Sequence, residues 1–166
     1  MTDSLVVRDY QDSDWPQLWP IIEQVVRAGD TFPFDPAMSE DTARSIWVES
    51  APGRTTVAVD PSGVVLGTAK MGTNRPGPGS HVSTASYMVP AAARGRGVGR
   101  ALVIDSLDWA REKGYAAMQF NAVVANNVAA VTLYEDLGFA VVGTVPEAFE
   151  HPVDGRVGLH VMHIRL

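Results

Sequence analysis

Residues 94–102 read Arg94-Gly95-Arg96-Gly97-Val98-Gly99-Arg100-Ala101-Leu102, and the predicted fold is built around this stretch. Its first seven residues hold three arginines and three glycines, between a predicted strand that ends at Pro90 and a predicted helix that begins at Val98. Glycine lets backbone amides converge on an anion, the helix N-terminus is partially positive, and arginine donates paired hydrogen bonds to phosphate. The stretch predicts a pyrophosphate-binding turn; the alternative is a flexible turn with solvated arginines.

Two common nucleotide-binding motifs do not fit this turn. The chain has no G-x-x-x-x-G-K-[ST], so a P-loop is excluded. The glycines at 95, 97 and 99 do not have the G-x-G-x-x-G spacing of a dinucleotide-binding fold. The predicted pyrophosphate therefore belongs to another class of ligand.

Hydrophobic periodicity predicts a mixed fold around the turn. From Val98 to Lys113 the apolar residues fall on one half of a helix, which indicates a helix packed on a sheet. Pro20 predicts a kink or a late start in the first helix. The other predicted elements are strands at 5–8, 55–59, 64–69, 81–89 and 118–124, strands starting at 139 and 156, and helices ending near 28 and spanning 39–47 and 127–137. This order predicts an α+β or mixed α/β fold with one central sheet.

The composition excludes several classes of protein. The 166 residues include 13 Lys and Arg against 19 Asp and Glu, a net charge of −6, so no nucleic-acid partner is expected. The chain has no cysteine, which excludes disulfides and thiolate chemistry and suits a cytoplasmic protein. No uncharged apolar stretch reaches about 18 residues, so no membrane partner is expected.

A second motif places an asparagine and a tyrosine on one helical face. Asn127, Ala130, Tyr134 and Leu137 recur at helical spacing. Taken alone, an asparagine at this point is a helix cap, and a tyrosine on an apolar stripe is a core residue with its hydroxyl satisfied.

Together the two motifs resemble those of the GCN5-related N-acetyltransferase (GNAT) superfamily. Val89-Pro90 followed by residues 94–102 matches its [RQ]-x-x-G-x-[GA] loop for the pyrophosphate of acetyl-CoA, and residues 127–139 match its N-x-x-A-x-x-L-Y-x-x-x-G-F element. The resemblance implies a single N-acetyltransferase domain over residues 1–166. It also implies a mixed, mostly antiparallel sheet of about 6–7 strands flanked by about 4 helices, splayed between the strands 81–89 and 118–124.

The same resemblance implies acetyl-CoA as the co-substrate. Backbone amides from Gly95 to Gly99 would hold its pyrophosphate, and the opened backbone of Met88 and Val89 would bind the pantetheine arm like an added strand. The implied cofactor-binding residues are Met88, Val89, Arg94, Gly95, Arg96, Gly97, Val98, Gly99, Arg100, Asn127 and Ala130.

Direct acetyl transfer needs a neutral amine, a polarised thioester carbonyl and a proton for the departing thiolate. The resemblance implies Tyr134 as the acid and a backbone N–H near Val89 as the polarising group. Neither 81–89 nor 118–124 contains Asp or Glu, so a water chain is the expected base. Asn121 is the candidate to hold that water or the amine; the alternative is a structural amide satisfied by its neighbours.

Three further segments, 31–35, 120–124 and 143–149, resemble a bacterial subgroup related to fungal acetyltransferases of azetidine-2-carboxylate, a proline analogue. This resemblance implies a small amine or amino-acid acceptor close to Phe32, Phe34, Tyr87, Asn121 and Glu147. Ordinary packing of the aromatic residues is the alternative.

The function expected from these motifs is an acetyl-CoA-dependent N-acetyltransferase for a small amine. The alternatives are a non-catalytic acyl-CoA sensor and a protein or peptide N-acetyltransferase. No metal is expected, because His160 and His163 point to opposite faces of a strand. By analogy with the superfamily, the chain could form a homodimer.

Overall fold

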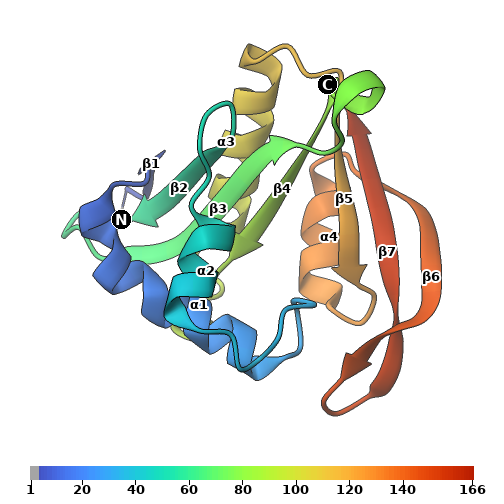
Figure 1. Cartoon of the computed structure of the whole chain (residues 1–166), viewed down its shortest axis with the longest axis horizontal. Helices are drawn as coiled ribbons and strands as arrows, with labels where there is room; N and C mark the ends of the chain where they lie inside the picture. The colour runs from blue at the N-terminus through green and yellow to red at the C-terminus, as the bar shows by residue number, and fades with distance from the viewer. Residues whose placement is uncertain (1–3) are drawn as a thin grey trace.

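A computed structural model describes residues 4–166, which form a seven-stranded sheet with four α-helices around it (Figure 1). The strand order is β1-β2-β3-β4-β5-β7-β6, and β4–β5 is the parallel pair. The strands are β1 (Val6–Asp9), β2 (Arg54–Val59), β3 (Val65–Thr73), β4 (Val82–Met88), β5 (Ala117–Val124), β6 (Ala140–His151) and β7 (Gly155–Arg165). The helices are α1 (Trp15–Ala28), α2 (Glu40–Trp47), α3 (Val98–Glu112) and α4 (Val128–Asp136). The predicted mixed α+β fold is confirmed.

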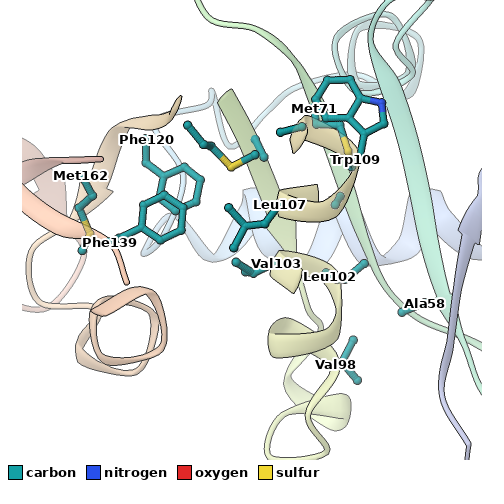
Figure 2. Packing of buried hydrophobic residues seen from close by; sticks show 14 of the residues in the cluster. Ala58, Met71, Val98, Leu102, Val103, Leu107, Trp109, Phe120, Phe139 and Met162 are labelled. Atoms are coloured by element: carbon teal, nitrogen blue, oxygen red, sulfur yellow. The ribbon is translucent and has the colours of Figure 1, made fainter. Parts of the chain in front are cut away.

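Two apolar clusters cover the two faces of the sheet. The first lies under α1 and α2 and includes Leu18, Ile22 and Trp47. The second lies under α3, whose predicted apolar half is buried as expected. Figure 2 shows Val98, Leu102, Val103 and Leu107 in this second cluster, with Phe120 stacked on Phe139 at a centroid distance of 4.3 Å. Each face of the sheet therefore has its own apolar layer, whereas the edge strand β6 is exposed along most of its length.

The first helix passes through Pro20 without interruption. It begins at Trp15 with Pro16 in its first turn, and it ends at Ala28, where Gly29 adopts a left-handed φ of 64°. The predicted late start at Pro20 is wrong, because the apolar face of α1, which includes Leu18 and Ile22, is buried on the sheet and outweighs one missing hydrogen bond. Among residues 4–166, no helix has the length and apolar character needed to cross a membrane.

The sheet opens between β4 and β5, as the family resemblance implied. These strands pair only at their first residues, where Val82 and Ser83 of β4 face Ala117 and Met118 of β5. Beyond that point β4 continues to pair with β3 on its other side, and β5 with β7. Farther along β5, a bulge between Phe120 and Val123 interrupts its pairing with β7. One backbone edge of β4 is thereby left open to a ligand.

Candidate active site

A cavity of about 960 Å³ lies where β4 and β5 separate. Its walls are the α1–α2 loop, β4, the glycine-rich turn before α3, and the segment from β5 into α4. Most of the site residues expected from the sequence line it: Phe32, Phe34, Tyr87, Met88, Val89, Arg94, Gly95, Gly97, Val98, Gly99, Arg100, Asn121, Asn127, Ala130 and Tyr134.

The structure does not bring two expected site residues to this cavity. Arg96 is exposed on the outside of the glycine-rich turn. Glu147 is exposed on β6, where a register shift between Val145 and Phe149 gives it a left-handed φ of 51°. That bulge sets the direction of the side chain at 147, and a resemblance over a short segment does not report it.

The glycine-rich turn has the geometry of an anion site. Gly95 and Gly97 adopt left-handed φ angles of 76° and 78°, and open space lies where their side chains would be. The backbone N–H groups of residues 95–97 have no hydrogen-bond partner among the residues that the structure describes. The first turn of α3 contains no acidic residue, so the positive end of a 15-residue helix faces the same place. With Arg94 and Arg100 at the rim, these groups fit a pyrophosphate.

Two tyrosines stand side by side in the cavity wall, with ring centroids 6.2 Å apart. The Tyr87 hydroxyl shares a 2.6 Å hydrogen bond with Ser106 Oγ of α3 and lies 3.8 Å from Met118 Sδ. The Tyr134 hydroxyl has no partner within residues 4–166. Burial raises the pKa of Tyr134 well above its ordinary value, so this group stays protonated near neutral pH. Of the two, Tyr134 is therefore the hydroxyl that is free to donate to a ligand.

The two expected asparagines occupy different surroundings. Asn127 is the N-cap of α4, and its Oδ1 accepts from the Ala130 N–H at 3.3 Å, as the cap interpretation predicted. Asn121 lies at the β5 bulge, where its Oδ1 accepts from Gln119 Nε2 at 2.9 Å and its Nδ2 donates to Asn74 Oδ1 at 2.6 Å. Both side chains line the cavity while being held by neighbouring groups.

Sequence analysis did not single out several cavity residues. Thr84 and Ser86 of β4 lie on the same strand face, opposite the face from which Tyr87 reaches α3. Their alternation with apolar residues was readable from the sequence, whereas their place in the same cavity wall as Asn121 was not. His151, at the end of β6, also lines the cavity. Asp30 of the α1–α2 loop is the one carboxylate among the described residues that line it.

Comparisons with known proteins agree with this geometry. A family model described as the acetyltransferase (GNAT) family matches residues 8–139. A GCN5-related N-acetyltransferase from Kribbella flavida is 56% identical, with a TM-score of 0.97 and full coverage of both chains. N-acetyltransferase aca1 of Schizosaccharomyces pombe is 29% identical over 141 residues, 76% of this chain and 68% of that protein. The yncA protein of Salmonella typhimurium, solved with its cofactor acetyl-CoA, is 24% identical with a TM-score of 0.82 over 98% of this chain and 94% of its own.

Proposed function

The chain belongs to the GNAT family of acetyltransferases, and from this premise we propose that it transfers the acetyl group of acetyl-CoA directly to the amine of a small molecule. An amino acid or an amino-acid analogue is the acceptor class that we favour. The observation that carries the proposal is one cavity that joins the open glycine-rich turn to the unpartnered Tyr134 hydroxyl. We place the reaction in the cytoplasm, within a single domain over residues 1–166.

The cavity offers a separate surface to each part of acetyl-CoA. The pyrophosphate would be held by the free amides of residues 95–97, the N-terminus of α3, and Arg94 and Arg100. The pantetheine arm would run along the open edge of β4 at Met88 and Val89, as an added strand. This placement brings the thioester between β4 and β5, next to Tyr134.

The transfer requires one bond to form and one to break. The lone pair of the neutral amine attacks the thioester carbon, and the C–S bond then breaks with its electron pair on sulfur. The Tyr134 hydroxyl donates its proton to the departing thiolate, and the proton lost by the amine leaves through water held by Ser86, Thr84 and Asn121. The Tyr134 phenolate then regains a proton from water, which restores the acid for the next turnover. The net proton movement is from the amine to the sulfur, and no carboxylate on β4 or β5 takes part.

The first experiment measures thiol release from acetyl-CoA with amino acids, polyamines, aminoglycosides and short peptides, for the wild type and for Tyr134→Phe. We expect turnover with small amines, and a loss of roughly a hundredfold or more in kcat for the variant, which is the usual contribution of a general acid. The Kd for acetyl-CoA should not change, because the Tyr134 hydroxyl lies at the thioester and the pyrophosphate is bound elsewhere.

Tyr115→Phe is the matched control, since the Tyr115 hydroxyl bonds to Thr73 outside the cavity. Its turnover should equal that of the wild type. Acetyl-CoA binding without turnover on any amine would favour the acyl-CoA sensor, and the absence of both would end the proposal.

A further inference from the structure

His151 is the last residue of β6, at the tip of the β6–β7 hairpin, and the turn that follows contacts its Nδ1. Its Nδ1 accepts hydrogen bonds from the backbone N–H groups of Val153 at 3.2 Å and Asp154 at 3.1 Å. Because two N–H groups point at Nδ1, which also lies 3.7 Å from Asp154 Oδ2, we assign Nδ1 as the acceptor and the proton of the neutral ring to Nε2. The turn therefore makes Nε2–H of His151 a hydrogen-bond donor.

The hairpin tip is tied to the rest of the cavity wall. Asn126, which follows β5, donates from Nδ2 to Asp154 Oδ2 at 2.7 Å. Asn126 and His151 both line the cavity, and the His151 side chain is only 14% exposed. Within residues 4–166, Nε2 of His151 has no hydrogen-bond partner, and this atom keeps some access to solvent. The ring is therefore held through Nδ1, and Nε2 stays open to a further partner.

The position of His151 in the sheet assigns it to the acceptor. In the strand order β4-β5-β7-β6, the hairpin is separated from β4 by the full width of the opening. Acetyl-CoA is already provided for by the edge of β4 and by the glycine-rich turn. Asp30 is the one carboxylate among the described lining residues, and the lining arginines, Arg94 and Arg100, flank the turn. His151 thus lines the cavity away from the groups assigned to acetyl-CoA, on the side left for the acceptor.

We propose that His151 is a specificity-determining residue whose Nε2–H binds a carboxylate or carboxamide oxygen that the acceptor carries beside its amine. This inference rests on the proposed function and assigns a residue to the recognition of the amino-acid type of acceptor favoured there. A simple alkylamine that displaces water from Nε2 offers this donor no acceptor in return, and that loss disfavours its binding.

Calorimetric titration tests the proposal with three ligands of one skeleton, each added to the protein saturated with CoA. The ligands are leucine, leucinamide, and the amine in which an isopropyl group replaces the carboxamide. We expect one or both oxygen-bearing ligands to bind about three- to tenfold more tightly than the hydrocarbon, as one hydrogen bond allows. The Kd of leucine compared with that of leucinamide then shows whether the carboxylate or the carboxamide oxygen binds more tightly.

Two substitutions separate recognition from the structure of the turn. His151→Asn keeps an acceptor for the Val153 and Asp154 amides but lacks the reach of Nε2, so it should abolish the preference. His151→Gln extends an N–H toward the Nε2 position and should restore part of it. His160→Asn changes another histidine of the same hairpin, bonded to Thr144 outside the cavity, and should keep the full preference.

Equal binding of all three ligands to the wild type, or an unchanged preference in His151→Asn, would overturn the inference. A change confined to acetyl-CoA affinity would overturn it too, since His151 would then serve the cofactor. Because ligand affinity is measured without turnover, these outcomes stay distinct from a failure of the proposed acetyl transfer.

Discussion

Gly67→Ala should destabilise the protein and disturb the start of α3. Gly67 lies on β3 directly beneath that helix, and a methyl group there would be 2.7 Å from Val98 Cγ1, 3.1 Å from the Met88 carbonyl oxygen and 3.2 Å from Leu102 Cδ1. Carbon atoms in good contact are about 3.5–4.0 Å apart, so the Val98 overlap approaches 1 Å. Overpacking of this kind costs about 1–3 kcal/mol, which for a chain of this size lowers Tm by roughly 2–12 °C.

Thermal unfolding measures the loss of stability in Gly67→Ala, and calorimetric titration with acetyl-CoA measures the effect of the disturbed α3 start on cofactor binding. Val98 is the first residue of α3, and Met88 belongs to the open edge of β4, so relief of the overlap shifts both expected cofactor contacts. We expect acetyl-CoA affinity to fall severalfold. Gly72→Ala is the control on the same strand, because its methyl group would meet only Gly53 Cα at 3.8 Å. Equal melting temperatures for the two variants would refute the reasoning.

Two further predictions concern stability and pH. Burial raises the folded-state pKa of Tyr134, so its contribution to stability is complete below about pH 10 and is lost as pH rises toward the folded-state value. Unfolding in urea should therefore show a smaller alkaline loss of stability for Tyr134→Phe than for the wild type. The paired hydrogen bonds from Arg8 at 2.8 Å lower the pKa of Asp14, whose contribution is present above about pH 4 and is lost as pH falls through the folded-state value. Asp14→Asn should cost about 1–2 kcal/mol at neutral pH, allowing for the partial exposure of Arg8, and the difference from wild type should vanish in acid.

The elements of the fold that the sequence predicts well are those whose pattern is local. The apolar half of α3, the short helix predicted over 39–47 and the strand predicted over 55–59 each depend on residues that are close together in the chain. The glycines at 95 and 97 are likewise a local signal, because a left-handed φ is a property of single residues. The late helix start predicted from Pro20 is wrong because α1 is kept helical by its packing on the sheet, whose residues are distant in the sequence.

The candidate site was predictable only in part, because its acceptor side depends on register. Glu147 and His151 are four residues apart on β6, yet His151 lines the cavity and Glu147 does not. Shifts in the β6–β7 pairing, between Val141 and Gly143 and between Val145 and Phe149, determine this outcome. Nothing in the sequence of one strand specifies where its partner bulges.

The charges of the cavity explain why the sequence identifies the acetyl donor more readily than the acceptor. Pyrophosphate binding needs cations and free amides close together. Arg94, Arg100 and the glycines therefore lie in one short segment that can be identified from the sequence. The acceptor must instead be a neutral amine when it attacks, and a cluster of carboxylates around it would favour the unreactive ammonium form. The gap between β4 and β5 accordingly presents hydroxyl and amide side chains such as Ser86 and Asn121, which come from separate strands. Neutral groups from separate strands select a ligand by shape and by single hydrogen bonds. Because they are far apart in the sequence, they form no contiguous motif that would identify the acceptor.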